Sequence, residues 1–230
     1  MSHVHLVIHH RCAQLTLEQA ELALEGGADG IFLISHDGAD AELPALAADL
    51  SKRWAAARTA RAMRPLVGLS LLTFDPIAAF RALVESTAQA LWVGASGISS
   101  SGTTPEAREL ATAAGTHPET TIFAGVAFKY QAADPDPAAA AQAARALGFL
   151  PTTSGSGTGL APALEKIERM SRAVQGQLAV ASGMTSANVA LFAPLVEHIL
   201  VSTGVALDEH RLDPARLREF VSEVRRVRPA

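Results

Sequence analysis

Short runs of apolar, mostly β-branched residues alternate along the chain with longer segments that have the period of an amphipathic helix. These runs predict eight strands, at residues 4–9, 30–35, 66–72, 90–95, 121–128, 148–153, 178–182 and 198–203. The helical segments predict eight helices, at residues 17–26, 41–63, 76–86, 104–115, 137–146, 161–175, 186–195 and 213–227. Several of these helices open with Asp-Pro, Thr-Pro or Ser, which are typical helix N-termini.

Eight alternating strand and helix units in 230 residues match a single (β/α)8 TIM barrel, an α/β fold that typically needs ~250 residues, better than a doubly wound sheet. The Pro- and Ala-rich piece at 132–140 reads as a loop entering the fifth helix, and 99–102 as the loop after strand four. Because no linker interrupts the pattern, we expect residues 1–230 to form one domain. Pro151 removes a ladder donor and predicts that strand six ends there.

Composition narrows the class of protein. Apolar residues make up 49% of the chain and charged residues 18%, which suits one large core and excludes a disordered chain. With a net charge of -4 and no basic stripe, nucleic acid is not an expected partner. No apolar run reaches the ~20 residues of a membrane helix. The single Cys12 and an N-terminus without a leader pattern indicate a cytoplasmic protein.

Glycine-bearing loops follow the last three predicted strands. In a barrel, function lies at the C-terminal ends of the strands, and phosphate sites are often built from the loops after strands seven and eight. A flexible linker is the alternative for the first loop, since its composition is similar. The recurrence of the pattern favours a phosphate site, with the candidates Ser154, Gly155, Gly157, Thr158, Gly159, Ser182, Gly183, Ser202, Thr203 and Gly204.

Lys129 follows the fifth predicted strand. There it can pair with an anionic ligand or, if desolvated, form a Schiff base with a carbonyl substrate. The alternative is a lysine exposed at the barrel rim. We favour anion contact or catalysis over a lysine that is merely exposed. Within catalysis, the Schiff base is the less favoured role.

His9, His10 and Arg11 end the first predicted strand. They offer an acid–base imidazole and a guanidinium for phosphate. Strand alternation lets only one of the two histidines face the barrel. His3 and His5 share a face of this strand, but no cluster of carboxylates or cysteines accompanies them, so we expect no metal and no cofactor.

Ser35, His36 and Asp37 close the second predicted strand. Contiguous residues cannot form a catalytic triad because their side chains diverge, so His36 or Asp37 would move a proton alone. A plain turn at Asp37-Gly38 is equally compatible with the pattern. Asp75 is expected to cap the helix that starts at Pro76. Cys12 is expected to be a small buried residue, and its position just past strand one leaves a reactive role open.

Six segments carry a resemblance to a known family. They are GADGIFLISHDG (27–38), LVGLSLLTFD (66–75), IFAGVAFKYQ (122–131), GFLPTTSGSGTG (148–159), ASGMTSANV (181–189) and ILVSTGVALD (199–208). In this order they resemble the BtpA family, phosphate-binding-type barrels named for a photosystem I biogenesis factor. The resemblance runs from about Gly27 to Val224.

The resemblance implies a ligand face that comprises Lys129, Thr153, Ser154, Gly155, Thr158, Gly159, Ser182, Gly183, Ser202, Thr203 and Gly204. Three loops depart from the family pattern. HHRCAQ replaces a His-Leu-Pro-Pro-Leu-Pro-Gly type segment, Thr73-Phe74-Asp75 an Arg-Asn-Asp type element, and Tyr130-Gln131 a His-Ala pair. A retained anion site with altered chemistry fits these changes, and so does loss of catalysis.

Together these features predict an enzyme that acts on a phosphorylated small molecule, a sugar phosphate or a nucleotide. The reaction class would be isomerase or lyase/transferase, with the glycine loops and Arg11 holding phosphate, Lys129 neutralising it or polarising a carbonyl, and His9, His10, His36 or Asp37 moving protons. The alternative is a non-catalytic, BtpA-like binding or assembly factor. The substrate, the functional histidine and the oligomeric state, a homo-oligomer included, stay open at this point.

Overall fold

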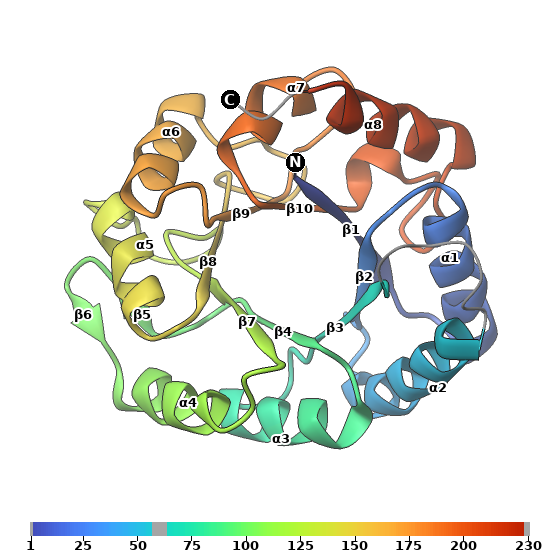
Figure 1. The fold of residues 1–230 in the computed structure, drawn as a ribbon, viewed down its shortest axis with the longest axis horizontal. Coiled ribbons are helices and arrows are strands. Elements are labelled where there is room, and N and C mark those ends of the chain that lie inside the picture. Colours follow the sequence, from blue (N-terminus) through green and yellow to red (C-terminus); the bar gives the residue numbers. More distant parts are fainter. Residues whose placement is uncertain (1, 57–63, 228–230) are drawn as a thin grey trace.

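The eight expected barrel strands close into one parallel barrel in the computed structural model, which describes residues 2–56 and 64–227 (Figure 1). Each strand pairs with its neighbours in chain order, and the last returns to the first, with His3 beside His198. The barrel strands are β1 (His3–His9), β2 (Gly30–Ile34), β3 (Leu66–Ser70), β4 (Ala90–Val93), β7 (Thr121–Gly125), β8 (Leu150–Ser154), β9 (Ala179–Ala181) and β10 (His198–Val201).

Helices surround this barrel on its outside (Figure 1). They are α1 (Ala13–Glu25), α2 (Leu43–Ala56), α3 (Pro76–Ser86), α4 (Pro105–Gly115), α5 (Pro137–Ala146), α6 (Leu164–Ala173), α7 (Val189–Phe192) and α8 (Pro214–Arg226), with 3-10 turns η1 (Asp40–Glu42), η2 (Ala193–Leu195) and η3 (Thr203–Val205). The expected (β/α)8 barrel is therefore confirmed. The part of the second expected helix at 57–63 lies outside the described residues.

Proline residues set several helix boundaries. Asp75 caps α3 by accepting hydrogen bonds from the backbone N–H groups of Ile77 and Ala78, as expected before Pro76. The seventh expected helix, 186–195, is shorter than expected. The α-helical part ends at Phe192, because Pro194 has no N–H to continue it, and the chain passes into η2.

The expectation that strand six ends at Pro151 is wrong, because β8 continues to Ser154. Pro151 lacks one ladder donor, but Thr152 to Ser154 still pair with β9 and hold the strand.

Two loops differ from expectation. The strand expected at 121–128 ends at Gly125, because the chain turns at Ala127, whose φ of 45° is incompatible with a strand. Lys129 therefore lies in a loop past the strand. The segment expected as a plain loop at 99–102 takes part in a small hairpin of β5 (Ile98–Ser99) and β6 (Gly102–Thr103).

The core has two parts. One lies between the barrel and the helices, and the other fills the barrel interior with Phe32, Phe123 and Leu200. The rings of Phe32 and Phe123 meet edge to face with their centroids 4.9 Å apart. A filled interior leaves room for a ligand only at the ends of the barrel.

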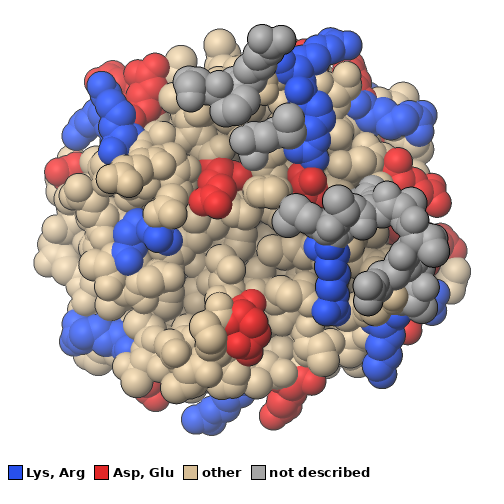
Figure 2. Space-filling view, viewed as in Figure 1, with Lys and Arg blue, Asp and Glu red and all other residues tan. Residues whose placement is uncertain are grey.

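Charged side chains are scattered on the face where the strands begin. Figure 2 shows this face, with Lys and Arg interspersed with Asp and Glu both at its edge and nearer its centre, over the area that is not drawn grey. No basic patch gathers on this visible area. Within the described segments, no helix combines the length and the apolar character needed to cross a membrane.

Candidate active site

A cavity of about 480 Å³ opens at the C-terminal ends of the barrel strands. All eight barrel strands or the loops after them contribute to its lining. Its sequence-predicted members are His9, His36, Lys129, Thr158, Gly159, Ser182, Gly183, Ser202 and Thr203. Residues from distant parts of the chain thus meet at the end of the barrel where function is expected.

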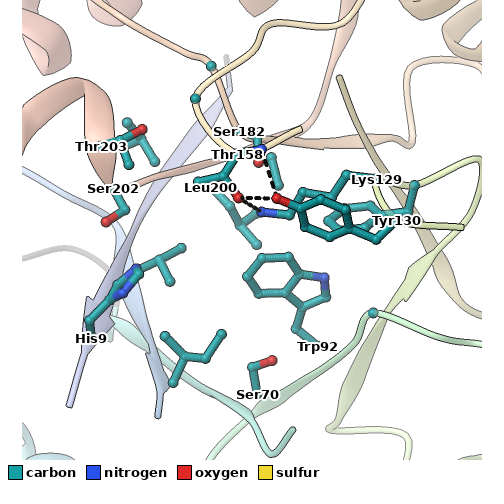
Figure 3. A pocket seen from close by; sticks show the side chains of 18 of the residues that line it. His9, Ser70, Trp92, Lys129, Tyr130, Thr158, Ser182, Leu200, Ser202 and Thr203 are labelled. Atoms are coloured by element: carbon teal, nitrogen blue, oxygen red, sulfur yellow. Dashed lines mark hydrogen bonds between the residues drawn. The ribbon is translucent and has the colours of Figure 1, made fainter. Parts of the chain in front are cut away.

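Lys129 reaches across the cavity toward the loop after β8 (Figure 3). Its Nζ donates to Thr158 Oγ1 at 3.0 Å, and the Tyr130 hydroxyl lies 3.1 Å from the same oxygen. Burial lowers the pKa of Lys129 below its usual value, and the neighbouring Tyr130 opposes this shift. No Asp, Glu or Arg belongs to the described residues that line the cavity. Lys129 is therefore a partly desolvated cation without a carboxylate beside it.

Lys166, on α6, fixes the loop that carries Lys129. Its Nζ donates to the carbonyl oxygens of Ala127 at 2.6 Å and Ser154 at 2.8 Å. Burial lowers its pKa to about 8, with Asp134 acting in the opposite direction. Ser154 Oγ in turn accepts a hydrogen bond from the Lys129 backbone N–H at 2.8 Å. Ser154 thus lies behind the site as a buried support, and it does not line the cavity.

His9 faces the cavity from the side opposite Lys129 (Figure 3). Burial lowers its pKa to about 4, and the nearby His36, with ring centroids 5.0 Å apart, adds to the effect. His9 is therefore neutral at pH 7. Its Nδ1 is buried and has no hydrogen-bond partner among the described residues.

His10 points away from the cavity, as alternation predicts for one of the two histidines. Its Nδ1 lies 2.9 Å from Thr16 Oγ1, and its Nε2 lies 3.4 Å from a carboxylate oxygen of Glu42. These contacts hold it between β1 and the helices outside the barrel. The structure therefore does not bring His10 to the site where we expected a proton-transfer group.

Arg11 and Asp37 also stay outside the cavity. Both are exposed and pair with each other at 3.6 Å, because they follow adjacent strands and project into solvent. Ser35 Oγ accepts hydrogen bonds from the backbone N–H groups of Asp37 and Ala39, which makes this segment a turn. Cys12 is exposed, so the expectation that it is buried is wrong.

Two glycines let the last three loops pack against one another, and a third lets the loop after β8 fold back on itself. A Cβ on Gly155 would overlap the carbonyl oxygen of Leu160, and one on Gly183 would overlap the backbone of Ala161. A Cβ on Gly204 would overlap the carbonyl oxygen of Met184. The loops after β8, β9 and β10 therefore form one continuous wall. Gly155, Gly157 and Gly204 belong to its structure and do not line the cavity.

This wall offers hydrogen-bond donors to the cavity. Within the described segments, the backbone N–H groups of Gly183 and Thr203 have no backbone acceptor. The hydroxyls of Ser182 and Ser202 line the cavity beside them. Ser182 has a φ of 71°, a strained value for a residue other than glycine, and such strain concentrates at functional sites. η3 begins at Thr203, where barrel enzymes commonly place a short helix against phosphate.

The described residues contain no group of three or more His, Cys, Asp or Glu side chains that could hold a metal ion. His3, His5 and His198 gather at the opposite end of the barrel. Their rings stack, and His5 Nε2 lies 2.8 Å from His198 Nδ1.

The fold is shared with several solved structures. No protein-family model and no curated protein matches the chain. Phosphoribosyl anthranilate isomerase from Thermus thermophilus superposes with a TM-score of 0.68 at 15% identity, covering 98% of this chain and 100% of that one. Thiamine phosphate pyrophosphorylase from Pyrococcus furiosus gives 0.67 at 17% identity, covering 98% and 96%. The isomerase from Thermotoga maritima gives 0.65 at 15% identity, covering 98% and 99%.

These likenesses establish the class of the protein as a TIM barrel. At such low identities they establish the fold alone. The resemblance to the BtpA family stays a prediction.

Proposed function

We propose that the protein is an enzyme that acts on a phosphorylated small molecule in this cavity by isomerase- or lyase-type acid–base chemistry. One observation carries the proposal: a partly buried lysine faces a wall of donors, and no described lining residue is a carboxylate. Such a site favours a dianionic group, because the lysine and the unpaired N–H groups stabilise it and no lining carboxylate repels it.

The phosphate would rest against the loops after β9 and β10. Gly183, Ser202 and Thr203 supply backbone and hydroxyl donors there, next to the short helix η3. The structural neighbours support a phosphorylated substrate, since the isomerase and the pyrophosphorylase both bear names of phosphorylated compounds. Their fold is the one that this chain adopts.

The reacting part of the substrate would lie between Lys129 and His9, which stand on opposite sides of the cavity (Figure 3). The Lys129 ammonium would stabilise negative charge that develops on a carbonyl or leaving oxygen. Neutral His9 can accept a proton, with His36 beside it as the second imidazole of the pair. A bound phosphate dianion favours the protonated form of His9 and thus aids that transfer.

The alternative, a non-catalytic binding or assembly factor, requires an apolar outer surface. Six large hydrophobic side chains are exposed among the described residues, and Leu72 and Tyr130 of this set line the cavity. Leu160 lies in the wall loop. Half of the exposed apolar set thus belongs to the cavity face, which favours ligand binding there.

The proposal is tested with variants of two lysines. Lys129→Met should lose most of the thermal stabilisation that phosphate monoesters give the native protein, which is ~2.7 kcal/mol at 100 times Kd. Lys52→Met, an exposed lysine on α2, should keep it. Once a turned-over substrate is found in such a screen, Lys129→Ala should abolish turnover and leave the fold intact. If no phosphorylated compound stabilises the native protein, the proposal fails.

A further inference from the structure

The part of the cavity away from the donor wall is apolar. The barrel strands contribute Val7, Ile34, Trp92 and Leu200 to its lining, and the β7 loop adds Phe128. All five side chains are at least nine-tenths buried. A ligand that enters this region meets hydrocarbon and aromatic surface.

Few polar groups in this region are available to a ligand. The Gln131 amide is already used inside the protein, since its Oε1 accepts from the Phe128 N–H at 3.0 Å and its Nε2 donates to the Gly94 carbonyl at 2.7 Å. The remaining polar groups are the Ser70 hydroxyl, the two imidazoles of His9 and His36, and the Trp92 indole N–H, which is buried and has no partner among the described residues. A sugar with several hydroxyls would leave most of them without partners here, and each buried unpaired hydroxyl costs on the order of 1–3 kcal/mol.

Aromatic rings frame the same region. The Trp92 and Phe128 rings meet edge to face with centroids 5.8 Å apart, and Trp92 also meets Phe32 at 6.2 Å. At the rim, Leu72 is 50% exposed and Tyr130 is 80% exposed. Figure 3 shows the Trp92 ring between His9 and Tyr130, under the end of the Lys129 side chain in this view. A flat ring of a ligand packs well against aromatic side chains arranged in this way.

We infer that the substrate carries an aromatic or heteroaromatic ring at the end away from its phosphate, and that it is not a bare sugar phosphate. This inference rests on the proposed function, because it takes the phosphate to be held at the donor wall. The cavity volume of about 480 Å³ accommodates both groups at once. The sequence leaves open a sugar phosphate or a nucleotide as substrate. The nucleotide, which carries a flat nucleobase, fits the apolar lining better.

Binding of three small probes tests the inference. A Trp54→Phe variant leaves Trp92 as the sole tryptophan, since the chain has two. Its fluorescence is then titrated with benzyl phosphate, ribose 5-phosphate and benzyl alcohol. We expect benzyl phosphate to bind at least ten times more tightly than ribose 5-phosphate, and benzyl alcohol to bind most weakly. Displacement of benzyl phosphate by inorganic phosphate serves as a second readout.

The outcomes separate the two proposals. If ribose 5-phosphate binds as tightly as benzyl phosphate, the inference about the ring is overturned and the phosphate site stands. If benzyl alcohol binds as tightly as benzyl phosphate, the phosphate site fails. If none of the probes binds, both proposals fail.

A rim variant locates the ring. Leu72→Ser should weaken benzyl phosphate roughly threefold and leave inorganic phosphate unchanged, because Leu72 follows β3, whereas the loops after β8, β9 and β10 form the donor wall. Leu191→Ser, on α7 outside the cavity and 58% exposed, is the matched control and should change neither. An equal loss for both probes in Leu72→Ser would overturn the placement of the ring.

Discussion

At the scale of single residues, the two lysines of the site have separate tasks. The Lys129 ammonium faces the cavity, whereas the Lys166 ammonium donates hydrogen bonds to the carbonyl oxygens of Ala127 and Ser154. Ala127 has a φ of 45°, so the loop takes a sparsely populated conformation that neighbouring contacts must hold. Lys166 supplies two of these contacts.

Lys166→Met should therefore loosen the loop that carries Lys129. The carbonyl oxygens of Ser154 and Ala127 would each lose the hydrogen bond from Lys166. The Ala127 carbonyl would keep the hydrogen bond from the Thr153 hydroxyl, at 3.1 Å. We expect a loss of ~1–3 kcal/mol in the free energy of unfolding by urea, with weaker phosphate binding. Lys52→Met controls for the removal of a charge. Stability and binding equal to those of the native protein would show that Lys166 does not position the site.

At the scale of elements, the glycine loops work as one wall. Gly183 combines a φ of 70° with a Cβ position that the Leu160–Ala161 backbone already fills. The packing between the loops after β8 and β9 thus depends on the missing side chain.

Gly183→Ala should separate these two loops. We expect a loss of ~1–3 kcal/mol in stability from the backbone strain, together with loss of phosphate binding. Gly115→Ala, at the end of α4 with open space around its Cβ position, should lower neither stability nor phosphate binding. Melting curves with and without inorganic phosphate measure both effects. Full phosphate stabilisation in Gly183→Ala would argue against a role of the wall in binding.

The sequence predicts the elements better than the site. Strands and helices follow from the local apolar period. Some errors fall where one residue ends an element, at Ala127 and Pro194, and another where Pro151 does not end its strand. Side-chain direction in loops depends on distant partners, which the pattern does not contain. For this reason the sequence did not reveal that Arg11 pairs with Asp37 outside the cavity. Nor did it distinguish Lys166, which supports the site, from other charged residues on an amphipathic helix.

At the scale of the whole molecule, buried or half-buried imidazoles lie at both ends of the barrel. His9 lines the cavity, and His5 and His198 contact each other at the end where the strands begin. Burial lowers the pKa of all three, to about 4 for His9 and His198 and well below the usual value for His5. For His5 and His198, the neighbouring imidazoles add to the shift.

These depressed pKa values make the fold sensitive to acid. Between pH 6.5 and about 4 the unfolded chain binds protons that the folded chain excludes, so the free energy of unfolding should fall as the pH is lowered through this window. Urea unfolding at pH 7.5, 6 and 5 measures the slope. His198→Asn removes one of the titrating groups and should flatten it, whereas His117→Asn, at the surface beside α4, should not. An unchanged slope in His198→Asn would assign the acid sensitivity to other groups.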